Sequence, residues 1–184
     1  GKGSYYEGGI RVPLLMKWPG KIEPNSSSAA RVSNLDFYPT LQNIVSPEKK
    51  ALLLDGIDLK PIFEDKTQVE RDLFFHFPIY LQEYQGLQDG SRDPLFRTRP
   101  GSVIISGDWK LHEYFEDGEL ELFNLIDDPS EENNVAEQNP DKTQELRKKL
   151  MEWRATTNAK VPSQSNPEYD AAFEQQKIKE KSLR

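Results

Sequence analysis

A lysine placed between glycines is the first feature of this 184-residue chain that could do chemistry. Lys2 lies between Gly1 and Gly3, and Glu7 follows shortly after it. Glycine lets the backbone approach a ligand closely, and a lysine there can bring a compact positive charge onto an anionic oxygen. The alternative is an exposed lysine with no role, which is the interpretation expected for the isolated chain.

The two histidines are the other candidates for chemistry. His76 stands in the aromatic run 73–77, directly before Pro78. A substrate contact is one hypothesis for His76, and a structural histidine with satisfied hydrogen bonds is an equally good one. His112 falls inside an expected strand and is interpreted as structural. The paired carboxylates Asp127 and Asp128 have no converging partners nearby in sequence, so they are interpreted as surface turn formers.

Composition narrows the classes of protein to which this chain can belong. The net charge is −7 and the isoelectric point is near 5.0, so no basic excess exists to replace the counterions of nucleic-acid phosphates. Without cysteine the chain has neither disulfides nor thiolate zinc sites. Hydrophobic residues make up 35% of the chain, which is low. This share indicates either a very polar surface or a chain whose hydrophobic core is completed by residues outside it. No apolar run approaches the roughly 20 residues of a membrane span, and no signal peptide opens the chain.

The first third of the chain predicts a loop, a buried strand and a helix. Residues 1–11 are glycine-rich, and the apolar run 12–18 is typical of a strand buried on both faces, although too few partner strands follow nearby. Ser33 can cap a helix over about 35–45. A short helical turn is expected at 59–63.

The rest of the chain predicts a small antiparallel sheet. Region 82–100 is interpreted as an irregular loop because glycine and proline interrupt it. Turn signals between apolar runs indicate a meander. The expected strands cover residues 73–77, 102–106, 109–115 and 119–125.

The clearest helix follows the last of these strands. Asn139 can cap it and Pro140 suits its first position. Leu146, Leu150 and Trp153 fall at helical spacing and form one apolar stripe, which should pack on one face of the sheet.

Six residues near the N-terminus form a specific pattern. They resemble the segment of type I sulfatases in which a lysine precedes Glu-Gly-Gly-x-Arg-x-Pro, and they are Lys2, Glu7, Gly8, Gly9, Arg11 and Pro13. Further motifs of that family follow in the same order: Trp18-Pro19-Gly20, Asp36-Phe37-Tyr38-Pro39-Thr40, Asp55-Gly56-Ile57-Asp58-Leu59, Gly107-Asp108-Trp109-Lys110-Leu111, Glu121-Leu122-Phe123-Asn124-Leu125, and Asp128-Pro129-Ser130-Glu131 with Asn134-Val135. Over about residues 1–160 the chain resembles the C-terminal portion of a bacterial type I sulfatase, of the arylsulfatase family and alkaline phosphatase superfamily.

The resemblance implies a fold class and a domain division. Such sulfatases have a large α/β domain and a smaller C-terminal sheet-plus-helix subdomain. Residues 1–70 would be the end of the large α/β domain, and residues 71–160 the small antiparallel sheet packed by a C-terminal helix. Residues 161–184 would be a polar extended tail with a helical end at 170–181. The neighbours of the strand expected at 12–18 would lie in a missing N-terminal part, and the chain begins without Met, as if cut from a longer polypeptide.

The resemblance also implies a reaction. The family cleaves sulfate esters with a formylglycine nucleophile, made from Cys or Ser in a Cys/Ser-x-Pro-x-Arg motif, and with a divalent cation, usually calcium, held by oxygen ligands. Ser165-Asn166-Pro167 matches the start of that motif, but Tyr169 stands where arginine is required. We therefore expect Ca²⁺ and formylglycine upstream in a parent enzyme, and an isolated chain that is inactive and binds no cofactor.

Two residues receive roles from the resemblance. Lys2 is the catalytic candidate, in contact with sulfate, where it would act by electrostatic stabilisation. His76 is the substrate-binding candidate, because similar sulfatases carry His-x-Pro-His-Tyr near the substrate's sugar, although Ile79 replaces the second histidine here. Arg11 and Glu7 are expected to pair and brace the loop.

The expected ligand is a sulfated small molecule or glycan, in a periplasmic or extracellular setting, and neither nucleic acid nor a membrane is expected as a partner. Arg92, Arg97 and Arg99 could meet an anionic glycan, although a solvated loop is the preferred interpretation. Residues 1–70 should expose apolar surface, so the isolated chain could self-associate. Two alternatives stay open: a non-catalytic domain that binds glycan or protein, and a phosphate or phosphonate hydrolase of the same superfamily.

Overall fold

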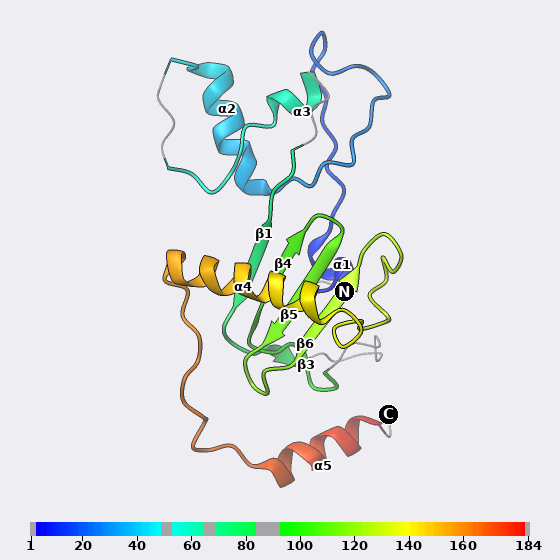
Figure 1. The fold of residues 1–184 in the computed structure, drawn as a ribbon, viewed down its shortest axis with the longest axis vertical. Helices are drawn as coiled ribbons and strands as arrows, with labels where there is room; N and C mark the ends of the chain where they lie inside the picture. The colour runs from blue at the N-terminus through cyan, green and yellow to red at the C-terminus, as the bar shows by residue number, and fades with distance from the viewer. Residues whose placement is uncertain (1–2, 49–52, 65–68, 84–92, 183–184) are drawn as a thin grey trace. The chain divides into compact units, whose positions relative to one another are not determined.

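The computed structural model describes residues 3–48, 53–64, 69–83 and 93–182, drawn as a ribbon in Figure 1. The chain divides into two compact units. The sheet unit comprises residues 1–12 and 72–184, and the helix unit comprises residues 13–71. Residues 1–12 thus cluster with the sheet and not with the residues that follow them. The assignment of residues 1–70 to a larger α/β domain stays a prediction.

A four-stranded antiparallel sheet forms the centre of the sheet unit, in the order β1-β4-β5-β6. Its strands are β1 (Leu73–Phe77), β4 (Gly101–Ser106), β5 (Trp109–Tyr114) and β6 (Leu120–Asn124). Each lies within a residue or two of its predicted place, so the expected small antiparallel sheet is confirmed. The turn signals succeeded because both hairpins of the meander join strands that are consecutive in sequence.

Helix α4 (Pro140–Thr157) covers one face of this sheet (Figure 1). Leu146 and Leu150 are fully buried against a central row of strand residues, Ile104, Leu111 and Leu122, which pair with one another in register. Trp153 stacks on Phe74 with ring centroids 4.9 Å apart. The predicted apolar stripe and its packing on the sheet are confirmed.

The start of α4 differs in one detail from the prediction. Pro140 occupies the first turn as expected, but the Asn139 side chain makes no capping hydrogen bond. Its Nδ2 donates instead to the Val135 carbonyl, at 3.1 Å. The Asn139 side-chain amide thus closes the preceding turn. The prediction that this side chain caps α4 is therefore wrong.

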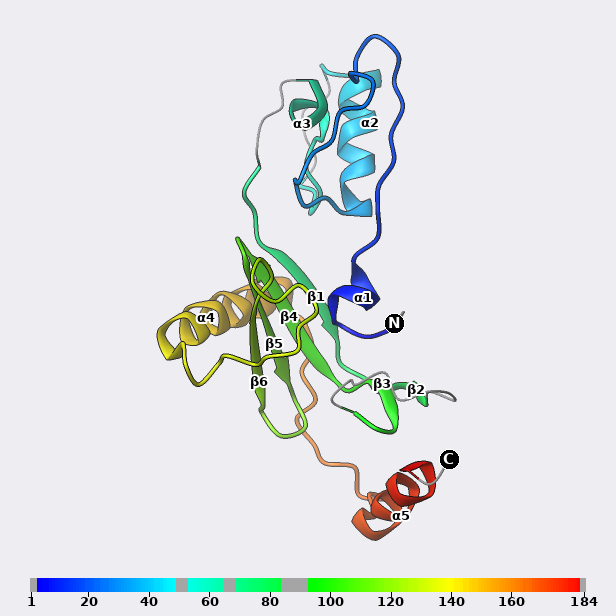
Figure 2. The same ribbon diagram turned by 90° about the vertical axis from the view of Figure 1, so that its right-hand side faces the viewer.

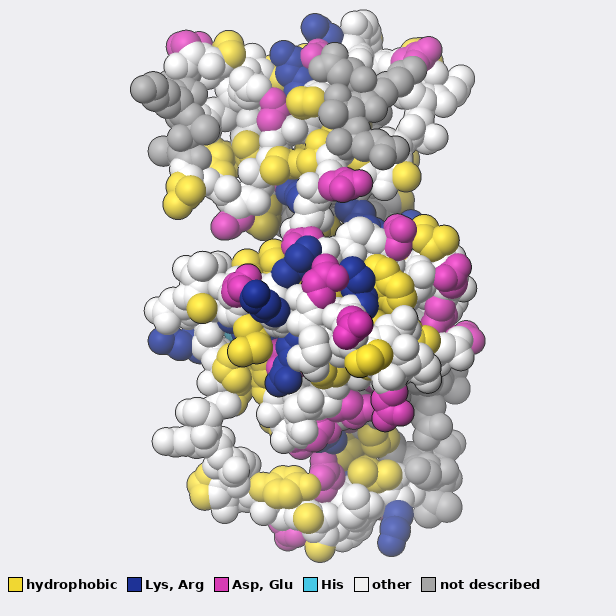
Figure 3. All heavy atoms as spheres, in the orientation of Figure 1, with side chains coloured by type: hydrophobic (Ala, Val, Ile, Leu, Met, Phe, Trp, Pro, Cys, Tyr) yellow, Lys and Arg dark blue, Asp and Glu magenta, His cyan; other side chains and the backbone are white. Residues whose placement is uncertain are grey.

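The outer face of α4 is charged with both signs. Figure 3 shows Lys or Arg and Asp or Glu side chains interspersed on the face that carries this helix. Its ion pairs include Lys142–Glu145 at 2.5 Å and Lys148–Glu152 at 3.9 Å. Exposed pairs of this kind contribute at most about 1 kcal/mol each. The apolar inner face therefore holds α4 in place. None of the described helices is long and apolar enough to cross a bilayer.

The N-terminal segment covers the opposite face of the sheet. Figure 2 shows α1 (Glu7–Ile10) and α4 on opposite sides. Tyr5 packs with Val103 in a second small core. Because side chains alternate along a strand, Leu111 faces α4, whereas Lys110 and His112 face the N-terminal segment.

The region expected to be an irregular loop contains a short ribbon. β2 (Leu81–Glu83) and β3 (Phe96–Thr98) pair antiparallel, so the loop prediction for 82–100 is wrong at both ends. Each strand has only three residues, which is too short for alternation to show in sequence. Helix α5 (Ala171–Ser182) matches the predicted helical end of the tail. Glu174 of α5 lies 3.1 Å from Arg99.

The helix unit contains η1 (Asn34–Asp36), α2 (Phe37–Val45) and α3 (Lys60–Glu64). The predicted helix after Ser33 is confirmed, with a capping box between Ser33 and Asp36. The helical turn expected at 59–63 is α3, displaced by one residue.

Asp36 is the centre of the helix unit. Its carboxylate is fully buried, and it accepts hydrogen bonds from Arg71 Nη1 at 2.7 Å and from the Ile57 amide at 3.0 Å. The Arg71 hydrogen bonds and the backbone amides keep the pKa of Asp36 lowered, although burial alone would raise it. The two motifs around residues 36 and 57 are therefore joined by one carboxylate.

The strand expected at 12–18 is not formed. Residues 11–18 have no ladder partner among the described residues, and Leu15 is 91% exposed. A strand is stabilised by pairing with neighbours, so an apolar run without a partner stays an extended segment. The prediction of a strand in this chain is therefore wrong.

Candidate active-site segment

Lys2, the predicted catalytic residue, lies outside the described residues, so the site is described from the residues that follow it. Gly3 has a φ of +99°, and a Cβ at this position would lie 2.6 Å from Leu81 Cδ2 and 3.2 Å from Arg97 Cδ. Only glycine satisfies both the left-handed backbone and the close approach. The backbone next to Lys2 therefore packs tightly against β2 and β3.

Tyr5 joins this segment to β1 and β4. Its hydroxyl lies 3.0 Å from the Phe77 carbonyl oxygen and 2.9 Å from the Gly101 carbonyl oxygen, and it donates to one of them. Burial raises the pKa of the Tyr5 phenol, so the group stays a neutral donor. A Cβ at Gly101 would lie 3.3 Å from the Tyr5 ring and 2.8 Å from Glu113 O. The tyrosine therefore needs a glycine at that position of the sheet.

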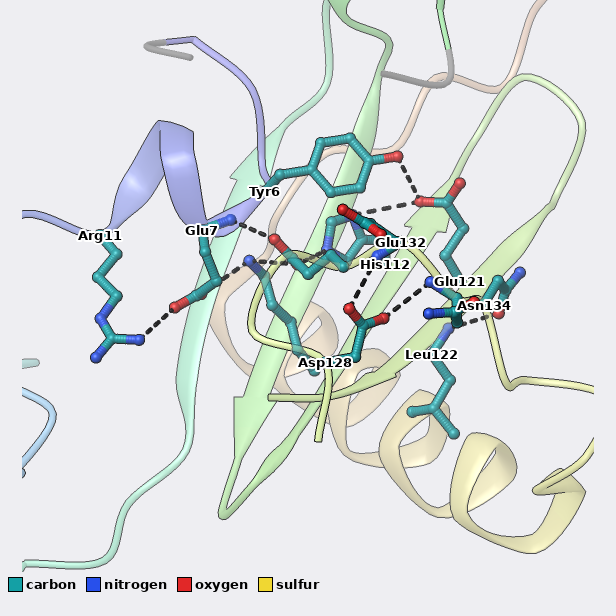
Figure 4. Close-up of polar contacts among 12 residues, drawn as sticks. Tyr6, Glu7, Arg11, His112, Glu121, Leu122, Asp128, Glu132 and Asn134 are labelled. Atoms are coloured by element: carbon teal, nitrogen blue, oxygen red, sulfur yellow. Dashed lines mark hydrogen bonds and ion pairs between the residues drawn. The ribbon is translucent and has the colours of Figure 1, made fainter. Parts of the chain in front are cut away.

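Tyr6 joins the segment to β5 and β6. Its hydroxyl donates to Glu121 Oε2 at 2.8 Å (Figure 4). The centroids of the Tyr6 and His112 rings are 5.0 Å apart. The Tyr114 hydroxyl lies 3.2 Å from the same Glu121 oxygen. Burial and the nearby Glu121 charge raise the pKa of both tyrosines. The buried Glu121 carboxylate thus accepts from Tyr6, and the neutral Tyr114 phenol lies beside it.

Glu7 meets a buried lysine. Lys110 Nζ lies 3.1 Å from Glu7 Oε1 and 2.8 Å from Glu131 Oε1, and the Lys110 side chain is 0% exposed. A buried ammonium group needs both countercharge and hydrogen bonds, and the two carboxylates supply them. The other Glu7 oxygen lies 3.3 Å from Arg11 Nη1, so the predicted pairing of Arg11 with Glu7 is confirmed (Figure 4).

Glu131 is presented to Lys110 by an ordered turn. The Asp128 carboxylate accepts from the backbone amides of Glu132 at 3.1 Å and Asn133 at 2.8 Å. The Leu122 amide of β6 donates a hydrogen bond to Asn134 Oδ1 at 3.0 Å, which attaches the turn to the sheet. Glu131 itself has a φ of +57°, a left-handed conformation that is uncommon for glutamate. The turn therefore aims the carboxylate inward, where it also accepts a hydrogen bond from the Glu7 amide.

His112 lies within the same buried network. Its Nε2 is 3.3 Å from Glu131 Oε1, and its Nδ1 is 3.3 Å from the Tyr114 hydroxyl. Because a carboxylate only accepts, we assign the proton of the neutral ring to Nε2. Burial lowers the pKa of His112 to about 4, and the Lys110 charge acts in the same direction against the opposing effect of Glu131. These contacts give His112 a structural role, as expected.

His76 lies on the sheet face opposite the N-terminal segment, residues 3–11, which follows Lys2 and is called the lysine-bearing segment below. Its ring contacts Trp153 of α4 at 6.2 Å between centroids. Nδ1 lies 2.7 Å from Ser102 Oγ, and Nε2 lies 2.9 Å from the Lys160 carbonyl oxygen. Both ring nitrogens thus have partners within the chain. This geometry favours the structural hypothesis for His76, and its contact with substrate stays a prediction.

The two described arginines of the 82–100 region have different surroundings. Arg99 pairs with Asp93, Glu116 and Glu174, so its charge is already compensated within the chain. Arg97 is exposed on β3, beside Gly3. Arg92 lies outside the described residues.

Among the described parts of the chain, no group of three or more His, Cys, Asp or Glu side chains could hold a metal ion. The carboxylates of partly exposed Glu7 and buried Glu131 converge on Lys110, which already supplies positive charge to both. These residues therefore do not fit the calcium ion that the resemblance implies.

The network around Lys110 was not predicted from the sequence. Each of three motifs contributes one charged residue to it: Glu7, Lys110 and Glu131. The available signal was a lysine inside an expected strand, with the apolar neighbours Trp109 and Leu111. Nothing in the motifs, however, says which charge pairs with which.

Comparisons with known proteins identify the family to which the chain is similar. Residues 1–158 match the protein family described as N-sulphoglucosamine sulphohydrolase, C-terminal. The chain is 36% identical over 175 residues to a sulfatase of Formosa agariphila, covering 86% of this chain and 29% of that protein. It is 28% identical over 162 residues to N-acetylgalactosamine-6-O-sulfatase of Bacteroides thetaiotaomicron, covering 79% of this chain and 28% of that protein.

The fold has solved counterparts. The structure of BT4656 in complex with its substrate D-glucosamine-2-N,6-O-disulfate matches with a TM-score of 0.65 at 24% identity, covering 88% of this chain and 31% of that one. This likeness supports the sheet-plus-helix fold. The chain spans under a third of the length of each of these three proteins. With the family matched over residues 1–158 and its motifs in order, the chain belongs to the sulfatase family, in the group described as N-sulphoglucosamine sulphohydrolase, C-terminal.

Proposed function

We propose that this chain is the C-terminal part of a sulfuric-ester hydrolase that acts on a sulfated sugar or aryl sulfate. The observation that carries the proposal is the family match over residues 1–158, which begins at the lysine-bearing segment. The Lys110 network supports it, because it brings the motifs of Glu7, Lys110 and Glu131 together in one place.

Lys2 is proposed as the catalytic residue of this chain. An ammonium group at this position would stabilise the negative charge on the sulfate oxygens in the transition state. The chain's own contribution is to hold the backbone beside Lys2, through Gly3, Tyr5 and Glu7, against the sheet. Formylglycine and a calcium ion are proposed to be supplied by residues outside this chain, where they would provide the nucleophile and neutralise the sulfate.

A sulfated glycan is the proposed substrate class. Two of the similar proteins are named for sulfated amino sugars: the N-acetylgalactosamine-6-O-sulfatase and BT4656 with its glucosamine disulfate. His76 is the proposed contact with the sugar, as an alternative to its structural role. A periplasmic or extracellular location is proposed with it, since polymeric sulfated glycans are met outside the cytoplasm.

The test is a pair of assays on the full-length protein with an aryl sulfate and an aryl phosphate. We expect hydrolysis of the sulfate, and a loss of about 10²-fold or more in kcat for Lys2→Ala, as for removal of one electrostatic stabiliser. Lys17→Ala removes an exposed lysine of the extended run 11–18, and this matched control should retain activity. Preference for the phosphate ester would instead favour a phosphate or phosphonate hydrolase.

A second measurement addresses the non-catalytic alternative. Calorimetry with sulfated oligosaccharides on the 184-residue chain should show no specific binding, because the proposed nucleophile and metal lie outside it. Specific binding by this chain, together with an inactive full-length protein, would favour a glycan-binding domain.

A further inference from the structure

The lysine-bearing segment is held to the sheet by three successive side chains. Tyr5 reaches the carbonyl oxygens of Phe77 and Gly101, and Tyr6 reaches Glu121. Glu7 is the third, and it is held twice, by its carboxylate on Lys110 and by its amide on Glu131. Three consecutive attachments restrict both the position and the direction of the backbone over residues 5–7.

Lys110 is the unusual member of this arrangement. On its face of the sheet its register partners are Ile105 and Phe123, which are buried and apolar. An apolar residue at position 110 would suit such neighbours and avoid the desolvation of an ammonium group. A buried ion pair is weak evidence for stability alone, but it selects one arrangement over others.

The charge specifies which residue of the segment stands over position 110. A shift of the segment by one residue would bring Tyr6 or Gly8 to Lys110 in place of Glu7. Neither supplies a countercharge, so the ammonium group would keep only Glu131. The two tyrosine contacts are made by neutral groups of the same type at adjacent positions, and they discriminate less between registers.

We propose that Lys110 is a positioning residue, which acts through Glu7 to fix the register of residues 3–10, the segment that follows Lys2 in sequence, on the sheet. This inference rests on the proposed function for its consequence in catalysis. The anchoring itself is a property of the described residues. Lys110 touches neither substrate nor nucleophile in this proposal.

The experiment uses the full-length protein with Lys110→Met, Glu7→Gln and the double variant. Methionine keeps the length of the lysine side chain and removes its charge. Lys149→Met is the matched control, since Lys149 is a half-exposed lysine of α4 that pairs with Asp72 on the other face of the sheet. Each variant is examined by hydrogen exchange of the backbone amides and by kcat and KM for a small aryl sulfate.

Lys110→Met should raise hydrogen exchange at least about 10-fold in residues 3–11 and leave β4, β5 and β6 protected. It should lower kcat by roughly 10- to 100-fold with KM changed by less than about 3-fold, because a misplaced stabilising group costs transition-state binding. The double variant should lose no more than the worse single variant, since both remove the same interaction. Lys149→Met should change neither quantity.

Unchanged hydrogen exchange in residues 3–11 would overturn the proposal. Hydrogen exchange that rises equally over the whole sheet unit would also overturn it, because Lys110 would then have a general stabilising role. If Lys110→Met fails to fold, Glu7→Gln carries the same comparison, because its side chain is partly exposed. A wild-type protein that cleaves no sulfate ester overturns the proposed function and the role toward Lys2. The exchange result then decides the anchoring separately.

Discussion

Lys110 Nζ lies 2.8 Å from Glu131 Oε1, and both side chains are at most 1% exposed. The lysine is the second residue of β5, and the glutamate comes from a turn in which it adopts a left-handed backbone conformation. Backbone strain of this kind persists only where the surroundings over-determine it. Here the surroundings are Lys110, His112 and the Glu7 amide, all of which reach the same carboxylate.

Replacing Glu131 with glutamine should destabilise the sheet unit by about 2–3 kcal/mol. The substitution preserves shape but leaves the buried Lys110 with Glu7 as its remaining carboxylate, and loss of a partner from a buried pair is costly. Glu132→Gln, at the exposed next position of the same turn, should change stability by less than about 0.5 kcal/mol. Urea denaturation of the two variants measures the difference, and equal midpoints would contradict it.

His112 should make the sheet unit less stable in mild acid. Burial lowers its pKa to about 4 in the folded state, against an ordinary value near 6.5 in the unfolded chain. The unfolded state therefore binds more protons between these values, so the stability is present above pH 6.5 and is lost as the pH falls toward 4. The full effect is about 3 kcal/mol.

His112→Gln provides the comparison for this pH dependence. Glutamine can still donate toward Glu131 but does not titrate. Thermal unfolding of wild type and variant at several values between pH 4.5 and 7.5 should show a shallower slope for the variant. Parallel slopes would show that another group is responsible.

Leu150→Ala should cost roughly 2–5 kcal/mol, because Leu150 is fully buried between α4 and the sheet and its truncation leaves a cavity. Met151 is the adjacent residue on the helix and is 53% exposed. Met151→Ala should therefore cost less than about 1 kcal/mol. A similar loss in both variants, measured by guanidinium unfolding, would argue against the packing of α4 described here.

Asp36→Asn should loosen the helix unit. The carboxylate accepts from Arg71, Ser33 and Ile57, and an amide in its place would leave the mostly buried Arg71 guanidinium without its charged partner. We expect a loss of about 2–4 kcal/mol. Asp55→Asn, at an exposed position nearby, is the control. Protection of the Ile57 and Leu59 amides against hydrogen exchange reports the effect, and retained protection in Asp36→Asn would refute it.

The two units should differ in stability when the 184-residue chain is studied alone. The sheet unit has a fully buried core, whereas several apolar side chains of the helix unit are exposed, including Leu15, Leu41 and Val45. We expect slower hydrogen exchange in β4, β5, β6 and α4 than in α2 and α3. We also expect concentration-dependent association, measured by light scattering, because exposed apolar surface favours it. Equal protection in both units, or a monomer at all concentrations, would be the contrary result.

The sequence predicted the local elements of the sheet unit well. The strands of the meander are consecutive, and their turns are marked by Gly107 and Gly118, so nothing beyond neighbouring residues is needed to form them. The stripe of Leu146, Leu150 and Trp153 likewise lies within one helix. The ordered motifs also identified the family. In each case the information is contained in residues close together along the chain.

Tertiary structure decided what the motifs do together. Glu7 and Lys110 are 103 positions apart, and Glu7 and Glu131 are 124 positions apart. No local periodicity connects them, so their meeting depends on the N-terminal segment packing on the sheet face opposite α4. The same packing separated His76 from that segment, because alternate residues of β1 point to opposite faces. The run at 12–18 also depends on tertiary structure. A strand needs a neighbouring strand to pair with, and the local sequence does not say where that neighbour lies.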